Sequence, residues 1–135
     1  MKRPIWTRKR RAKGGKRPDL GISLKSRWEA NYARYLSHLQ AKGKIVGWAY
    51  EPKEFAFEQI QRGVRFYKPD FRVDLPDGTH FYVEIKGYMD AKSRVALKRM
   101  AKFYPDIRVR VVDAKEYADI ERVYRYLLPN WESPE

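Results

Sequence analysis

Residues 64–86 read VRFYKPDFRVDLPDGTHFYVEIK, and this stretch decides the fold. Apolar and polar residues alternate over 64–75 and again over 79–86, which predicts two β-strands. Pro76, Asp77 and Gly78 stand between the two strands, and this composition is typical of a tight turn. The sequence therefore predicts a β-hairpin in the middle of the chain.

The length of the turn decides which side chains share a face of the hairpin. A loop of two residues places Asp70 opposite Ile85, whereas a loop of three residues (76–78) places Asp70 opposite Glu84. The three-residue loop also gives one apolar face and one polar face, so we predict this register, with Gly78 in the left-handed conformation of a bulged turn. The polar face would then carry Lys68, Asp70, Arg72, Asp74, His80, Tyr82, Glu84 and Lys86.

The rest of the chain predicts helices on either side of this hairpin. Ser26 and Glu29 have the spacing of a helix capping box, and aromatic and leucine residues then recur at helical intervals. The expected elements are a helix at about 25–42, strands at 45–51 and 54–59, a helix from Asp90 to about 103, a strand at 107–111 and a helix at 114–128. This order, α-β-β-β-α-β-α, predicts an α/β fold with a mixed central sheet flanked by helices.

Composition bounds the class of protein. A chain of 135 residues fits one domain, and its net charge of +13 favours a polyanionic partner such as a nucleic acid. The absence of cysteine excludes disulfides and thiolate metal sites. No apolar run reaches the roughly 18–20 residues that span a bilayer. We therefore expect no membrane association and a cytoplasmic location, which would be the host cytoplasm if a phage encodes the chain.

Charge also suggests how the chain is divided. Nine of the first twenty residues are basic and one is acidic, which predicts a flexible basic arm over 1–21. The folded domain is expected over 22–128, and a short, frayed tail over 129–135. The arm would order on a phosphate backbone.

Two carboxylates and a lysine stand out on the polar face of the hairpin. Glu84 and Lys86 share one face of their strand because strand side chains alternate, and the predicted register sets Asp70 opposite Glu84. Two opposed carboxylates repel each other unless a cation lies between them, and Mg²⁺ prefers oxygen ligands. Lys86 would orient an attacking water and neutralise phosphate charge. The alternative is an exposed, charged strand face with weak cross-strand ion pairs.

These residues carry a resemblance to a known superfamily. Residues 67–71 (YKPDF) and 82–87 (YVEIKG) are similar to the PD-(D/E)XK nuclease signature, with Pro-Asp on one strand and Glu-x-Lys on the next. The expected order of elements resembles the restriction-endonuclease-like core of that superfamily. Within it, the small size and the basic arm most resemble phage endonuclease I and archaeal-type Holliday-junction resolvases.

The resemblance implies a site and a cofactor. It implies a metal bound by Asp70, Glu84, the backbone carbonyl of Ile85, and Glu29 from the first helix. Lys86, Glu84, Asp70 and Glu29 would be the catalytic residues. The implied cofactor is Mg²⁺, for which Mn²⁺ would substitute.

Several other residues have two interpretations each. Glu51 would be an extra metal ligand or a partner in a salt bridge at the end of a strand, and we favour the salt bridge. His38 and His80 are expected to be ordinary surface or packing residues. Aromatic residues of the first helix would stack on bases or pack in the core, and their helical spacing favours the core; they are Trp28, Tyr32 and Tyr35.

Basic residues outside the site are the candidates for DNA binding. Those on the helix at 90–103 recur at i, i+4 and i+8, which suits a phosphate track, although a solvated face is the alternative. The candidates are Arg8, Lys9, Arg10, Arg11, Lys13, Lys16, Arg17, Lys68, Arg94, Lys98 and Lys102.

These observations lead to one expected function and two alternatives. We expect a metal-dependent DNA endonuclease that acts as a homodimer on four-way junctions, because a two-fold substrate suits a two-fold enzyme. The first alternative is a nicking, mismatch or repair endonuclease of the same superfamily. The second is a non-catalytic basic nucleic-acid-binding protein, which would leave Asp70 and Glu84 unexplained because carboxylates repel phosphate.

Overall fold

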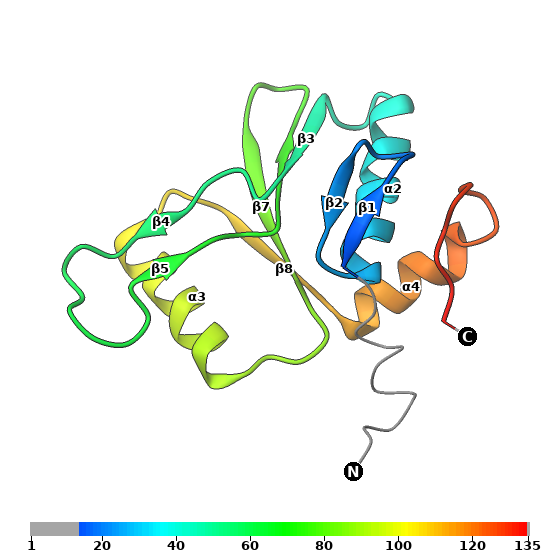
Figure 1. Ribbon diagram of the computed structural model, residues 1–135. Coiled ribbons are helices and arrows are strands. Elements are labelled where there is room, and N and C mark those ends of the chain that lie inside the picture. The colour runs from blue at the N-terminus through cyan, green and yellow to red at the C-terminus, as the bar shows by residue number, and fades with distance from the viewer. Residues whose placement is uncertain (1–13, 135) are drawn as a thin grey trace, which may run out of the picture.

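The computed structural model describes residues 14–134. In this part of the chain three helices flank a central sheet, and two short hairpins stand beside it (Figure 1). The elements are β1 (Gly15–Arg17), β2 (Ile22–Leu24), α2 (Arg27–Ala41), β3 (Gly47–Tyr50), β4 (Phe55–Ala56), β5 (Phe66–Tyr67), β6 (Phe71–Asp74), β7 (His80–Lys86), α3 (Ala91–Phe103), β8 (Val109–Asp113) and α4 (Ala114–Tyr124). The predicted α/β class with a mixed central sheet is confirmed.

The central sheet has the strand order β3-β6-β7-β8. β3, β6 and β7 are antiparallel neighbours, whereas β8 runs parallel to β7 because α3 connects the two strands by a crossover. Phe71 pairs with Val83, and Asp74 pairs with His80. Gly78 has a φ of 90°, which is the left-handed conformation that the bulged turn requires. The predicted three-residue loop is therefore confirmed, and it sets Asp70 opposite Glu84.

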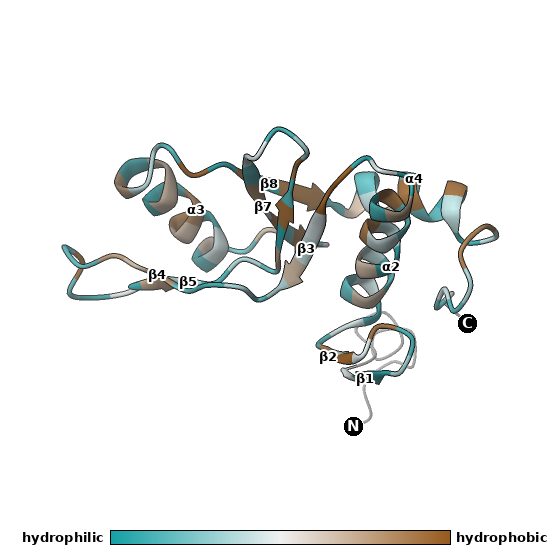
Figure 2. Ribbon diagram, turned by 90° about the horizontal axis from the view of Figure 1, so that it is seen from above, coloured by the Kyte–Doolittle hydropathy of each residue, from teal (hydrophilic) through white to brown (hydrophobic). Residues whose placement is uncertain are grey.

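Helices cover both faces of this sheet (Figure 2), with α3 on one side and α2 and α4 on the other. One core lies between the sheet and the α2–α4 layer and contains Leu36, Phe71, Val83, Val112 and Tyr117. A second core lies under α3 and contains Phe55, Phe57, Tyr67, Tyr82, Ala96 and Met100. The polar face of the hairpin is therefore covered around Tyr82 and Glu84, where the alternative of an exposed charged face is wrong, whereas Lys68 and His80 on the same face are exposed.

Aromatic residues of α2 belong to the first core. Trp28 stacks on Tyr117 with ring centroids 4.2 Å apart, and Tyr32 packs on Phe71 at 5.4 Å. Tyr35 contacts Tyr124, so all three predicted core aromatics pack inside the domain. The N-cap is also as predicted, because the Ser26 hydroxyl accepts a hydrogen bond from the backbone N–H of Glu29.

The two ends of the described chain are more ordered than expected. β1 and β2 pair as an antiparallel hairpin, so the flexible arm predicted over 1–21 is wrong for 15–21, and the rest of that prediction lies outside the described residues except for Gly14. At the other end, Glu132 forms ion pairs of 2.8 Å with both Arg17 and Arg34. Its backbone N–H donates to the Asn31 side chain at 2.9 Å. The C-terminal segment is therefore packed rather than frayed, because it neutralises two buried guanidinium groups.

Among the described residues, no helix is both long enough and apolar enough to cross a bilayer.

Candidate active site

Asp70 lies immediately before β6 and is held by backbone hydrogen bonds on both sides. Its N–H donates to the Val83 carbonyl at 3.0 Å, and its own carbonyl accepts from the Glu51 N–H at 2.8 Å. Its carboxylate accepts a hydrogen bond of 2.7 Å from the backbone N–H of Ile85 at Oδ2. Pro69 precedes it and keeps the chain extended without needing a ladder donor. The carboxylate of Asp70 is therefore fixed beside β7.

Glu84 lies on β7, opposite Asp70, and only 8% of its surface is exposed. Its Oε1 accepts a hydrogen bond of 2.8 Å from the hydroxyl of Tyr67. Its Oε2 lies 3.8 Å from Nζ of Lys86, two residues further along the same face. The predicted combination of two carboxylates and one lysine is thus brought together at one place on the sheet.

Burial raises the pKa of both carboxyl groups, and neighbouring negative charges raise it further. Burial raises the pKa of Asp70 to about 8, with further contributions from the charges of Glu84 and Glu29. Burial also raises the pKa of Glu84, against the opposing effects of the Tyr67 hydrogen bond and the Lys86 charge. Carboxyl groups that repel each other in a buried place favour a proton or a metal cation between them. The pair therefore has the electrostatics of a cation site.

Glu29 reaches the same region from α2. Its Oε1 accepts a hydrogen bond of 2.5 Å from the hydroxyl of Tyr50 on β3. Burial is the main reason why the pKa of Glu29 is raised. Its charge in turn raises the pKa of both Asp70 and Glu84, so Glu29 acts electrostatically on the pair. Its backbone N–H donates to the Ser26 hydroxyl in the observed cap, and a hydrogen bond with the Ser26 side chain also lowers the pKa of the Glu29 carboxyl group, against the effect of burial.

The donor set suits a hard cation, although the three carboxylates do not form one compact cluster. Within residues 14–134, no three carboxylate or histidine side chains are close enough together to hold a metal ion. The pair of Asp70 and Glu84 offers carboxylate oxygens, which are the ligands that Mg²⁺ prefers. Mg²⁺ is commonly bound by one or two carboxylates and completes its shell with waters and phosphate oxygens. The residues present therefore fit the expected metal without Glu29 as a direct ligand.

A salt bridge borders the site at the end of β3. Nζ of Lys25 lies 2.6 Å from Oε2 of Glu51, which is the role that we favoured for Glu51. This ion pair is the main reason why the pKa of Lys25 is raised, and the charges of Glu29 and Asp70 add to it. Lys25 is thus a second cation near the carboxylates. The two histidines have packing roles, because His38 contacts Tyr124 and His80 contacts Tyr82.

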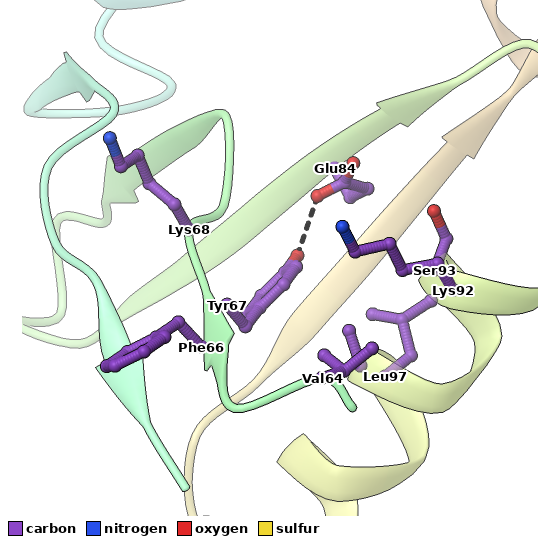
Figure 3. A pocket seen from close by; sticks show the side chains of 9 residues that line it. Val64, Phe66, Tyr67, Lys68, Glu84, Lys92, Ser93 and Leu97 are labelled. Atoms are coloured by element: carbon purple, nitrogen blue, oxygen red, sulfur yellow. Dashed lines mark hydrogen bonds between the residues drawn. The ribbon is translucent and has the colours of Figure 1, made fainter. Parts of the chain in front are cut away.

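A pocket of about 180 Å³ opens beside Glu84, between β5 and the first turns of α3. Figure 3 shows Tyr67 and Lys92 on either side of the space in front of Glu84. Other lining residues are Val64, Phe66, Lys68, Ser93, Ala96 and Leu97. The carboxylate of Glu84 is therefore reachable from the surface through this pocket.

The candidate DNA-binding residues fall into three groups. Lys16 and Lys68 are exposed, as are the α3 residues Arg94, Lys98 and Lys102, so these five are available to phosphate. Arg17 is 8% exposed and is bound to Glu132, so the prediction that it binds DNA is wrong. The remaining candidates, Arg8, Lys9, Arg10, Arg11 and Lys13, lie outside the described residues.

Sequence reasoning missed Tyr67, Tyr50 and Lys92. Tyr67 is three residues before Asp70, but Pro69 interrupts the strand between them, so alternation along the chain does not tell which face Tyr67 takes. Tyr50 and Lys92 reach the site from β3 and α3. A buried carboxylate needs hydrogen-bond donors, but Tyr67 and Tyr50 are 17 and 21 positions away from Glu84 and Glu29, so the sequence carried no local signal for these two contacts.

Fold and site together define a small three-layer α/β protein with a buried carboxylate pair beside a lysine. The chain belongs to the family described as "Protein of unknown function (DUF1064)", whose model matches residues 9–119. No curated protein and no solved structure matches the chain. The matched residues include β3 to β8 and therefore the whole candidate site.

Proposed function

We propose that this protein is a metal-dependent DNA endonuclease of the PD-(D/E)XK superfamily. The observation that carries the proposal is the alignment of Asp70 opposite Glu84 on β6 and β7, with Lys86 on the same face. The strand order β3-β6-β7-β8, with α3 as the crossover to a parallel β8, is the arrangement expected for that core.

The electrostatics support the same proposal. Without a bound cation, placing the ionised carboxylates of Asp70 and Glu84 close together away from water costs free energy. The raised pKa values of both groups reflect this cost. Natural proteins retain such an arrangement mainly at functional sites. Asp70 and Glu84 would hold Mg²⁺ with the backbone carbonyl of Ile85, and Glu29 would act on it from α2. Bound Mg²⁺ supplies Lewis-acid stabilisation of charge on a phosphate.

The chain's own residues have distinct roles in this proposal. The N–H of Ile85 orients the Asp70 carboxylate, and the Tyr67 hydroxyl orients that of Glu84. The ammonium of Lys86 lies beside Glu84, where it would bind a phosphate oxygen and orient the attacking water. Exposed Lys68 after β5 and the exposed lysines and arginine on α3 would bind the phosphate backbone, which gives affinity without sequence preference.

We further propose that a homodimer cuts four-way junctions, with two sites acting on two strands. A domain of this size offers little surface for reading base edges, so shape is the expected source of selectivity. Sedimentation with and without a junction tests the dimer. Equal cutting of junction and matched linear duplex over a salt series would contradict junction selectivity and leave the nuclease proposal standing.

The test of the nuclease proposal is direct. The purified chain is incubated with labelled four-way junction, linear duplex and single strands, in Mg²⁺, in Mn²⁺ and in chelator. We expect cleavage in either metal and none in chelator, and none by Asp70→Asn prepared in parallel. The absence of cleavage in both metals, or equal cleavage by Asp70→Asn, would refute the proposal.

A further inference from the structure

The pocket between β5 and α3 lies beyond the carboxylate pair and is not used by the roles proposed so far. Val64, Ala96 and Leu97 give it an apolar lining. Glu84 lines one side of it, and the Lys92 side chain extends from α3 toward that carboxylate (Figure 3). Phe66 on β5 and Lys68, directly after this strand, also line it. An apolar chamber thus ends at a proposed catalytic residue, with ammonium groups at its edge.

The size of the pocket restricts what it can take. At about 180 Å³ it is smaller than the roughly 300–1,000 Å³ of typical drug-sized ligand sites. It can therefore admit one flat ring but not a stacked base pair. Apolar surface suits the face of a nucleobase, and lysines at the rim suit the adjoining phosphate.

We propose that this pocket binds a single unpaired nucleotide of the DNA strand, next to the phosphate that is cut. This inference rests on the proposed nuclease function and specifies its substrate. The base lies on Val64 and Leu97, and Lys92 binds the phosphate of the same nucleotide. Lys92 is then a positioning residue, because it holds the strand against the site where Glu84 and Lys86 act.

A preference among DNA structures follows. Taking a base out of a paired duplex costs free energy, and the cost is smallest where the base is already unpaired. The protein should therefore favour DNA with an unpaired nucleotide, such as a bulge or the branch point of a flap or junction, over a fully paired duplex. The cut should fall beside that nucleotide.

The experiment measures binding in chelator, so that cutting does not interfere, and uses two labelled duplexes that differ by one bulged nucleotide. We expect the wild-type chain to bind the bulged duplex roughly tenfold more tightly, which is in the range that stacking of one base supplies. Leu97→Trp fills the pocket and Lys92→Ala removes the ammonium, and both should reduce the preference to about twofold or less. A fluorescent base analogue, 2-aminopurine, at the bulge should change its emission on binding to wild type but not to Leu97→Trp.

Matched controls make the result specific to the pocket. Leu127→Trp makes the same change at a position that is 65% exposed after α4, and Lys115→Ala removes a lysine whose side chain is 86% exposed on α4. Both controls should keep the wild-type preference. Folding of each variant is checked by thermal melting, and Lys92→Ala changes an exposed side chain, so it remains informative if Leu97→Trp does not fold.

Failure of this inference differs from failure of the nuclease proposal. Equal binding of bulged and paired duplex by wild type, or an unchanged preference in folded Lys92→Ala, would overturn the pocket assignment even if Mg²⁺-dependent cleavage is found. A bulge preference that both pocket variants lose, in a protein that cuts no DNA, would support the pocket and refute the nuclease.

Discussion

The hydroxyl of Tyr67 donates a hydrogen bond of 2.8 Å to Oε1 of Glu84, although the two residues belong to different sheets. Tyr67 lies on β5, which pairs only with β4 among the described strands, and Glu84 lies on β7 in the central sheet. The β4–β5 hairpin therefore covers the polar face of the central sheet and supplies the donor that a buried carboxylate requires.

Replacing this donor should change the pH dependence of cleavage. The Tyr67 hydrogen bond lowers the pKa of Glu84, against the effect of burial, so Tyr67→Phe should raise that pKa further. The ionised form of Glu84 would then be lost at higher pH, and the acid limb of the rate–pH profile should move upward. We expect a rate loss of roughly tenfold near pH 7, as for a lost charge-assisted hydrogen bond. Identical profiles for wild type and Tyr67→Phe would show that the contact has no role in the reaction.

Substitutions in the carboxylate site should abolish DNA cleavage without abolishing DNA binding. Asp70→Asn, Glu84→Gln and Lys86→Ala should each abolish cleavage and leave junction affinity within about tenfold of wild type. Phosphate affinity is spread over many lysines and arginines, whereas stabilisation of the transition state is concentrated in these three side chains. Gel-shift titration and single-turnover cleavage measure the two quantities. Robust cutting by Glu84→Gln would refute the assignment.

The stability of the metal-free protein should fall as the pH rises. The pKa of Asp70 is about 8 in the folded chain and 3.8 in the reference state, so the folded state binds the proton more tightly. The unfolding free energy contributed by this group is therefore fully present below about pH 4 and is lost by about pH 8. Asp70→Asn has no carboxyl group at this position, so its unfolding free energy should lack this pH dependence.

Urea denaturation in chelator over this pH range measures the effect. The curve for Asp70→Asn should fall less steeply than that for wild type, so that the variant is the more stable protein at pH 8. Mg²⁺ at pH 8 should raise the melting temperature of wild type and not that of the variant, because only the carboxylate pair binds the ion. Parallel curves for the two proteins in chelator would contradict the raised pKa.

Glu29 and Ser26 should have separable effects, although they form one cap. Glu29→Gln should lower the cleavage rate and raise the Mg²⁺ concentration required, with little change in melting temperature, because the glutamine keeps the backbone N–H that donates to the Ser26 hydroxyl. Ser26→Ala should lower the unfolding free energy by about 0.5–2 kcal/mol and leave the Mg²⁺ requirement unchanged. Melting curves measure the stability of both variants, and cleavage rates over a Mg²⁺ titration measure their metal requirement. Full activity of Glu29→Gln at every Mg²⁺ concentration would limit Glu29 to a structural role.

Two neighbouring cations of β1 should behave differently. Arg17 is buried against Glu132, so Arg17→Ala should cost about 3 kcal/mol of stability, at the lower end of the range for breaking a buried ion pair. Lys16 is exposed, so Lys16→Ala should leave stability unchanged and reduce the salt dependence of DNA binding by about one counterion. Denaturation and binding over a salt series test both variants. If Arg17→Ala keeps its stability and reduces the salt dependence of DNA binding, Arg17 would be restored as a phosphate ligand.

The sequence by itself determined the central hairpin. Alternation on either side of the turn residues Pro76, Asp77 and Gly78 allowed one coherent register, and that register places Asp70 opposite Glu84. The single strand expected over 64–75 was wrong, because this stretch is divided into β5 and β6, which lie in different sheets. These features are local, because strand faces follow from a period of two and the turn follows from the conformational freedom of glycine. The capping residues Ser26 and Asp90 were equally local and were also predicted.

Only the tertiary structure decided what surrounds this pair. Arg17 meets Glu132 across 115 positions of the chain, so no local pattern distinguishes it from the other basic residues near the N-terminus. The polar strand face that carries Glu84 is buried because the β4–β5 hairpin and α3 close over it, and this packing gives Glu84 its partner Tyr67 and its pocket. Burial and long-range pairing arise from the whole chain at once, so local patterns located the carboxylates but did not reveal their environment.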